Sequence, residues 1–302
     1  MIKILLYYKY VEIPDPAVYR AEHIRLCTQL DITGRVIISP EGINATVGGE
    51  KEAIEKYKAA ITADPLFSDI AFKESTSEEH VFKKLSVKIR PEIVSLKTGT
   101  DIVFSNNIKG KYIEPKELQQ AIEKDEEVYI VDVRNTYESY IGRFKNSIAL
   151  DIDNFRDLPT AVEKIKDLKD KKVVTVCTGG VRCEKASAYL LSRGFSDVSQ
   201  LHGGIITYGE AYPDAAFEGK CYVFDSRISV DINTPKKKKI IAECYHCHKP
   251  CDRYINCCNA VCNRQFVCCS DCDLQHMSSC CDECKSNSRF APCLEKHIYS
   301  EE

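Results

Sequence analysis

The chain has 302 residues, a length typical of two or three domains. Hydrophobic residues make up 44% of it and charged residues 29%, the composition of an ordinary globular protein, and no stretch of sequence approaches the ~18–20 apolar residues of a membrane span. The formal net charge of −3 excludes a strongly basic surface over the whole molecule. Because no membrane-spanning stretch is evident in the sequence, we expect a cytoplasmic protein.

Residues 1–92 predict a small domain with the order βαββαβ. Asp15 and Pro16 are typical of the N-cap and first turn of a helix, and Pro40-Glu41-Gly42 is typical of a hairpin turn. The expected elements are a strand over 2–11, a helix over 17–30, paired strands over 34–39 and 43–49, a helix over 50–61 and a closing strand over 82–90. This is the order of the ferredoxin-like (acylphosphatase-like) fold, which serves many unrelated functions.

A linker over 93–113, rich in turn-forming residues, precedes a second domain over 114–218. Its expected elements are helices over 114–124, 161–168 and 183–194 and strands over 127–134, 171–177 and 198–203. The runs VYIVDV and VVTV are apolar on both faces, as parallel strands covered by helices are. We therefore predict an α/β domain with a parallel sheet.

A cysteine stands at the junction of one such strand with the next helix. The loop reads Cys177-Thr178-Gly179-Gly180-Val181-Arg182. Its glycines allow successive backbone N–H groups to turn inward, the helix N-terminus adds partial positive charge, and Arg182 adds a full charge. All three favour a thiolate, so we predict a lowered pKa for Cys177 and a nucleophilic role. The same cradle also suits a persulfide.

We predict Cys177 and Arg182 as catalytic residues. The residues predicted to form the anion cradle are Thr178, Gly179, Gly180, Val181 and Cys183. The alternatives are that Cys177 is a buried core residue, that Arg182 is a solvated charge at a helix start, and that Cys183 is a small packing residue. In a functional role, Cys183 is a resolving thiol that forms a disulfide with Cys177.

Three segments carry a resemblance to a known family. They are YIVDVRNTYESYIGRFKNSIAL (129–150), VCTGGVRCEKASAYLLSRGF (176–195) and VSQLHGGIITY (198–208). Together they resemble a rhodanese domain: Asp132-Val133-Arg134 matches its strand-end signature, Glu138 the acid that follows, and Leu201-His202-Gly203-Gly204 its closing signature. Gly142-Arg143-Phe144 departs from the usual Gly-His-Ile. We expect Asp132 and Arg134 to form a buried pair that orders the loop, and a catalytic role is the alternative.

Further segments extend the resemblance over essentially the whole chain. GRVIISPEGINATVGG (34–49), CTGGVRCEKAS (177–187), CYVFDSRISV (221–230) and the C-terminal cysteines resemble the bacterial tRNA uridine hydroxylases. That resemblance implies oxygen-dependent hydroxylation of the wobble uridine of tRNA to 5-hydroxyuridine, with dioxygen as co-substrate and tRNA as partner. The family's essential cysteine falls on Cys177. No flavin, pterin or 2-His-1-carboxylate motif is evident in the sequence.

Two other functions are compatible with the cysteine loop. A rhodanese-type sulfurtransferase would carry a persulfide on Cys177 and pass its outer sulfur to an acceptor; the six-residue loop, one residue shorter than in rhodanese-fold phosphatases, fits such sulfur chemistry. A binding module without catalysis would use the loop to hold an anion and the C-terminal region to bind a partner.

Residues 219–302 are organised by cysteine rather than by hydrophobic periodicity. Of 17 cysteines in the chain, 13 lie between Cys244 and Cys293. In a cytoplasmic protein, repeated Cys-x2-Cys and Cys-x3-Cys spacings favour structural zinc over disulfides. We predict two ions, one held by Cys244, Cys247, Cys269 and Cys272 and one by Cys258, Cys262, Cys281 and Cys284.

Other ligands and other roles stay open for this region. The neighbours Cys257, Cys268 and Cys280 are possible replacements, as are His246 and His248; free thiols or an iron–sulfur cluster are further alternatives. Five aromatic and basic residues between the cysteines are expected either to contact RNA or to pack against the second domain: Arg253, Tyr254, Arg264, Phe266 and Arg289. Lys236–Lys239 is either a solvated linker or a phosphate contact.

Overall fold

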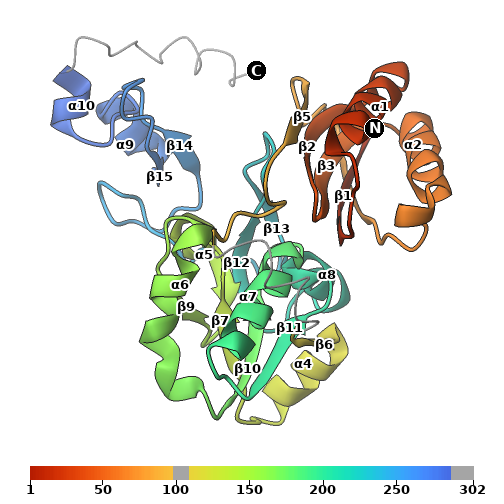
Figure 1. The fold of residues 1–302 in the computed structure, drawn as a ribbon. Coiled ribbons are helices and arrows are strands. Elements are labelled where there is room, and N and C mark those ends of the chain that lie inside the picture. The colour runs from red at the N-terminus through yellow and green to blue at the C-terminus, as the bar shows by residue number, and fades with distance from the viewer. Residues whose placement is uncertain (98–108, 287–302) are drawn as a thin grey trace.

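A computed structural model describes residues 1–97 and 109–286 (Figure 1). Arg289, Cys293 and part of the predicted linker over 93–113 lie outside the described residues. Among the described helices, none is long and apolar enough to cross a membrane. The boundaries predicted for the linker and the domains stay predictions.

The N-terminal domain is a five-stranded sheet with both helices on one face (Figure 1). Its elements are β1 Ile2–Tyr10, α1 Pro16–Gln29, β2 Thr33–Ser39, β3 Gly42–Glu50, α2 Lys51–Ala63, β4 Lys73–Ser77 and β5 Leu85–Ile89. The strand order is β4-β1-β3-β2-β5. Asp15 caps α1 through its carboxylate, which accepts hydrogen bonds from the backbone N–H groups of Ala17 and Val18, as the sequence predicts.

The closing strand of this domain corrects the sequence prediction. The strand that pairs with β1 and completes the ferredoxin-like order is β4, which the sequence analysis missed. The predicted segment over 82–90 does contain a strand, β5, but it lies at the opposite edge and runs parallel to β2. Lys-Glu-Ser-Thr-Ser of β4 is polar throughout and lies at a sheet edge, so it has no apolar alternation by which to recognise it.

The second domain contains the predicted parallel sheet, with strand order β6-β11-β10-β7-β9. Its main elements are β6 Lys111–Ile113, α4 Pro115–Glu123, β7 Tyr129–Asp132, α5 Thr136–Tyr140, β8 Gly142–Phe144, β9 Ile148–Ala149, β10 Lys172–Val176, α7 Val181–Ser192, β11 Asp197–Leu201 and α8 Gly204–Ala211. The helix predicted over 161–168 is mostly a 3₁₀ helix, Val162–Leu168, preceded by a short α6, Leu158–Ala161.

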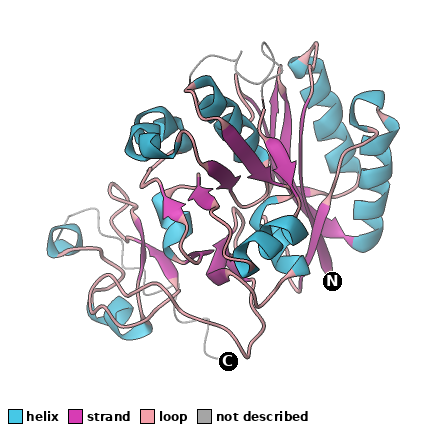
Figure 2. Ribbon diagram, turned by 90° about the horizontal axis from the view of Figure 1, so that it is seen from below, coloured by secondary structure: helices cyan, strands magenta, loops and turns pink. Residues whose placement is uncertain are grey.

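The C-terminal part begins with a three-stranded antiparallel sheet that joins it to the second domain. Strand β12 Phe217–Tyr222 pairs with β8 on one side and with β13 Ser229–Asp231 on the other. The cysteine-rich region follows with β14 Tyr254–Asn256, β15 Gln265–Val267, α9 Ser270–Gln275 and α10 Asp282–Ser286. Figure 2 shows that this region consists of short elements joined by long loops.

A buried ion cluster joins the first two domains. The Nζ atom of Lys185, on α7, lies 2.8 Å from Oε1 of Glu41 and 2.8 Å from Oε1 of Glu92, and all three side chains are at most 9% exposed. Glu41 also accepts a hydrogen bond from the backbone N–H of Ile93. Because a buried charge without a partner is costly, this cluster fixes the N-terminal domain against α7.

We predict that Lys185→Ala lowers the free energy of unfolding by about 3 kcal/mol, because it leaves two buried carboxylates without their cation. Urea denaturation measures the change. Lys171→Ala is the matched control: it removes an exposed partner of Glu127, and we expect a loss below ~1 kcal/mol. Equal losses in the two variants would show that the cluster does not stabilise the domain interface.

Candidate active site and metal centres

The cysteine loop begins after β10 and ends at α7, at the carboxyl edge of the parallel sheet. The backbone N–H of Gly180 donates a hydrogen bond to the Cys177 Sγ atom at 3.1 Å. Gly180 has a φ of 100°, a left-handed conformation that glycine adopts without strain. The side chains of Cys177 and Cys183 are both fully buried. The loop therefore directs backbone donors toward a buried sulfur atom.

The start of α8 holds the carbonyl groups of this loop. The backbone N–H groups of Ile205 and Ile206 donate to the carbonyl oxygens of Cys177 and Thr178 at 2.9 and 3.1 Å. A Cβ atom on Gly204 would lie 2.6 Å from the Cys177 carbonyl oxygen, which explains the glycine in the closing signature. With its carbonyl groups turned to α8, the loop keeps its N–H groups for the sulfur.

The loop environment favours the thiolate of Cys177. Burial by itself raises the pKa of this group. Three other effects outweigh burial and lower the pKa from 9.0 to about 6. They are the hydrogen bond from the Cys183 thiol, the charge of Arg182 and the backbone N–H groups of Arg182 and Cys183. Burial and the neighbouring Cys177 raise the pKa of Cys183 well above its ordinary value. The pair thus divides into one thiolate and one thiol that donates to it.

Arg182 acts from within a buried ion pair rather than as a free anion ligand. Its guanidinium makes two hydrogen bonds to the Glu138 carboxylate, at 2.5 and 2.7 Å, and Glu138 is completely buried. Asp132 and Arg134 form a second pair, with a 2.6 Å contact and no exposed surface, as the sequence predicts. The charge of Arg182 is among the causes that lower the pKa of Cys177.

Strand β1 of the N-terminal domain lies against the loop. A Cβ atom built on Gly179 would meet the Leu6 side chain at 2.8 Å, and one on Gly180 would meet the Tyr8 hydroxyl at 2.8 Å. The Tyr10 hydroxyl donates to the Val181 carbonyl oxygen at 3.0 Å. The helix-free face of the N-terminal sheet is therefore a second wall of the site.

A cleft of about 1350 Å³ opens between this sheet face and the loop. Its lining includes Tyr8, Arg35, Asn44, Lys73, Thr178, Gly179, Val181, Arg182 and Phe224. The sheet register aligns Lys73, Leu6, Thr46 and Arg35 in one row across four strands. Tyr8, Arg35 and Lys73 are not predicted as site residues from the sequence. Strand alternation would have put them on one face, but it does not say which face meets the loop.

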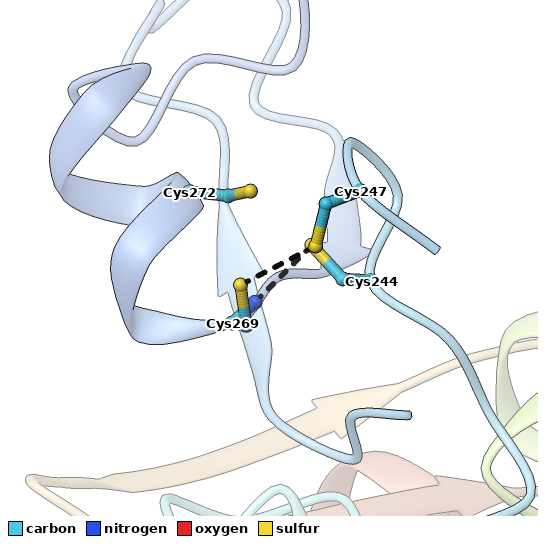
Figure 3. Close-up of side chains that lie close together, drawn as sticks. All are labelled: Cys244, Cys247, Cys269 and Cys272. Atoms are coloured by element: carbon cyan, nitrogen blue, oxygen red, sulfur yellow. Dashed lines mark hydrogen bonds between the residues drawn. The ribbon is translucent and has the colours of Figure 1, made fainter. Parts of the chain in front are cut away.

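The first predicted cysteine set is brought together in the cysteine-rich region. The Sγ atoms of Cys244, Cys247, Cys269 and Cys272 all lie within 4.8 Å of one another and point toward a common centre (Figure 3). Those of Cys247 and Cys269 are 3.7 Å apart, too far for a disulfide. Thiolates on a tetrahedral zinc ion lie ~3.8 Å apart. The donor set and its spacing fit zinc.

The second cysteine set differs from the prediction at two positions. The structure brings together Cys257, Cys262, Cys280 and Cys284, again within 4.8 Å, in place of the predicted set with Cys258 and Cys281. Cys280 is 6% exposed whereas Cys281 is exposed to solvent. Spacing alone does not say which of two adjacent cysteines turns inward, because neighbouring side chains point in different directions.

Most other residues considered in this region have structural partners. His246 contacts the Ser279 carbonyl oxygen at 3.0 Å, and neither His246 nor His248 belongs to the two cysteine groups. Tyr254 and Phe266 are buried in the core of the region, which favours packing over RNA contact for these two rings. Among the basic residues, Arg253 pairs with Asp273, Lys238 with Asp231 and Lys239 with Glu218.

Comparison with family models divides the chain into three segments. Residues 2–93 match the UPF0176 acylphosphatase-like domain, residues 114–211 the rhodanese-like domain and residues 218–285 the rhodanase C-terminal domain. These matches, together with the cysteine loop at the edge of the parallel sheet, define a protein with a rhodanese domain. It carries an additional N-terminal domain and a cysteine-rich C-terminal region.

Curated relatives narrow this class to one family. A tRNA uridine(34) hydroxylase of Cytophaga hutchinsonii is 46% identical over 290 residues, which cover 96% of this chain and 92% of the relative. One from Bacillus licheniformis is 43% identical over 99% of this chain and 93% of its own length. A solved rhodanese-like domain from Anabaena aligns with 37% of this chain and 80% of its own, at 22% identity and a TM-score of 0.32. The chain belongs to the tRNA uridine(34) hydroxylase family, which confirms the resemblance in the sequence.

We predict that the Cys177 thiol titrates near pH 6, with the thiolate present above this pH and lost below it. The ultraviolet thiolate absorbance of the wild type minus that of Cys177→Ser, followed from about pH 4 to 9, measures this midpoint without requiring access to the buried sulfur. Cys27→Ser is the control, because burial raises the pKa of Cys27 to about 12. A Cys177 midpoint at or above the ordinary thiol value would contradict the cradle.

Proposed function

We propose that this protein hydroxylates C5 of the wobble uridine, position 34, of tRNA to 5-hydroxyuridine, with dioxygen as oxidant and Cys177 as the reactive residue. The observation that carries the proposal is the thiolate-stabilising loop in a chain that is similar over its full length to tRNA uridine(34) hydroxylases. We place the reaction in the cytoplasm, where tRNA is found.

The proposed chemistry uses the thiolate as a transient nucleophile. Addition of the Cys177 sulfur to C6 of uracil makes C5 electron-rich toward the oxidant, and the sulfur leaves again when C5 loses its proton. One oxygen atom of dioxygen becomes the new hydroxyl group and the other becomes water. Two external thiols supply the two electrons and two protons that this balance needs, and they become a disulfide.

Access to the sulfur requires movement at the domain interface. Cys177 is fully buried, whereas the neighbouring Thr178, Gly179 and Val181 line the cleft. A uracil ring in the cleft therefore meets the loop backbone before it meets the sulfur. We propose that Leu6 and Tyr8, which lie against the two glycines, move when the substrate binds.

A sulfurtransferase is the second candidate, and the same geometry favours it. The Gly180 N–H that donates to the thiolate would also stabilise a persulfide on Cys177. In that case the outer sulfur atom passes to an acceptor and the thiolate returns. Transfer of thiosulfate sulfur to cyanide tests this activity directly.

We predict that cells lacking this protein contain less 5-hydroxyuridine-derived nucleoside in their tRNA, and that wild type restores it while Cys177→Ser does not. Mass spectrometry of tRNA nucleosides measures the change. Cys27→Ser, a matched change of a buried cysteine in the N-terminal core, is expected to restore the modification. Full rescue by Cys177→Ser would exclude the covalent role. A change in thiolated nucleosides alone would favour the sulfurtransferase.

We also propose that the cysteine-rich region binds two zinc ions in a structural role. Both cysteine groups offer four sulfur donors with no histidine, which suits tetrahedral zinc. The region has short elements and shares its core with the cysteines themselves, so it gains much of its folding energy from metal.

We predict two metal ions per chain, and one fewer after Cys280→Ser, which removes a ligand. Its neighbour variant, Cys281→Ser, is expected to retain both, because Cys281 lies outside the cysteine group. Native mass spectrometry with elemental analysis counts and identifies the ions. If Cys281→Ser loses an ion and Cys280→Ser does not, the ligand set predicted from spacing is correct. If the ions are iron and sulfide is present, the region holds an iron–sulfur cluster instead of zinc.

A further inference from the structure

A second cavity, of about 430 Å³, adjoins the active-site cleft. The two share lining residues, Arg35, Val223, Phe224 and Asp225, and therefore adjoin at these residues. The second cavity extends over Tyr222, Tyr254, Asn256 and Gln265 to the cysteine-rich region. The loop between β12 and β13, which carries Phe224, rises between the N-terminal sheet and this region (Figure 1).

Arg35, which lines both cavities, carries a charge without a counter-charge. Nearby arginines are neutralised: Arg227 pairs with Asp225 and Arg182 with Glu138. Within the described part of the chain, no carboxylate lies within ion-pair distance of Arg35, and its side chain is exposed. An exposed arginine where two cavities meet suits a phosphate group that bridges ligands in the two.

Phe224 supplies an exposed aromatic ring to the lining of the same two cavities. This phenylalanine is 42% exposed although it lines both cavities. Its ring packs edge-on against Tyr222, with centroids 5.3 Å apart, and the Arg182 guanidinium lies 5.8 Å from its centroid. A ring that is held on one side and open to a groove is a platform for base stacking.

Two side-chain amides at the far wall offer groups for a base edge. Gln265 Oε1 accepts a hydrogen bond from the Tyr222 hydroxyl at 2.9 Å, so its NH₂ group remains available as a donor. Asn256 Nδ2 donates to Asn263 at 3.4 Å, which leaves its carbonyl oxygen as an acceptor. These residues belong to β14 and β15, the two strands of the cysteine-rich region.

We propose that the second cavity is a binding subsite for the nucleotide next to the target uridine in single-stranded RNA. Arg35 holds the phosphate that joins the two nucleotides, Phe224 stacks on the neighbouring base, and Gln265 and Asn256 contact its edge. The volume of about 430 Å³ suits a ligand of the size of one nucleotide. The inference rests on the proposed tRNA hydroxylation and adds a substrate-reading role for the cysteine-rich region.

The test couples a protein change to an RNA change. Binding is measured for the full chain and a tRNA transcript with an unmodified wobble uridine, intact or with an abasic nucleotide immediately 5′ or 3′ of it. For wild type, we expect one abasic substitution to weaken binding about tenfold. Phe224→Leu should weaken binding of the intact tRNA to a similar extent and be insensitive to that same abasic substitution.

Matched variants keep the result interpretable. Tyr245→Leu removes an exposed ring of the same region that lines neither cavity, and it should retain the wild-type response to both abasic substitutions. Arg35→Gln should reduce the slope of log affinity against log salt by about 0.7, the value for one phosphate contact in a single strand. Arg25→Gln, on the exposed surface of α1, should leave that slope unchanged.

Two results would contradict the proposed subsite. One is that Phe224→Leu and wild type respond equally to both abasic substitutions. The other is that Arg35→Gln leaves the slope of log affinity against log salt unchanged. If the wild type still hydroxylates the intact tRNA in that case, the proposed function stands and only the subsite fails. If wild type neither binds nor hydroxylates the transcript, the proposed function fails and the subsite fails with it.

Discussion

Keeping a negative sulfur atom inside the protein is the constraint on which the rest of the site depends. Burial opposes the Cys177 thiolate, so the fold has to supply donors and charge within a few ångströms. The loop provides the Gly180 N–H, α8 removes the competing carbonyl groups, and Arg182 supplies the charge. Arg182 in turn needs Glu138, because a buried guanidinium alone would be as costly as the thiolate it stabilises.

The N-terminal domain is part of this arrangement and not an appendage. Its helices cover one face of the sheet, and the other face lies against the cysteine loop, with Leu6 and Tyr8 at the two loop glycines. A Cβ atom at either glycine would displace the end of the Leu6 or the Tyr8 side chain from the loop.

The sequence predicts features that depend on residues close together in the chain. It does not predict which distant segments lie next to one another. The loop follows from residues with short, characteristic spacing, and the buried Asp132–Arg134 pair follows from the resemblance to a rhodanese domain. In the first cysteine group, spacing indicates the pairs Cys244–Cys247 and Cys269–Cys272 but not that the two pairs come together. Strand β4 was missed because edge strands tolerate polar residues, and Cys258 was chosen over Cys257 because spacing does not give side-chain direction. The sequence does not show that Arg35 and Lys73 belong to one site. Only the sheet register places them in one row, because it pairs strands that are far apart in sequence.

The proposed metal sites and the proposed RNA subsite both lie in the cysteine-rich region. Its two short strands place Asn256 and Gln265 in the lining of the cavity that adjoins the active-site cleft. Such a small hairpin is marginally stable without further support. The two cysteine groups flank these strands in sequence and share their core. Metal binding would therefore hold the strands in place, and a loss of metal would weaken substrate binding without touching the Cys177 loop. Under the two proposals, metal loss and substitution of Cys177 would therefore affect different properties, the affinity for tRNA and the reactivity of the thiolate.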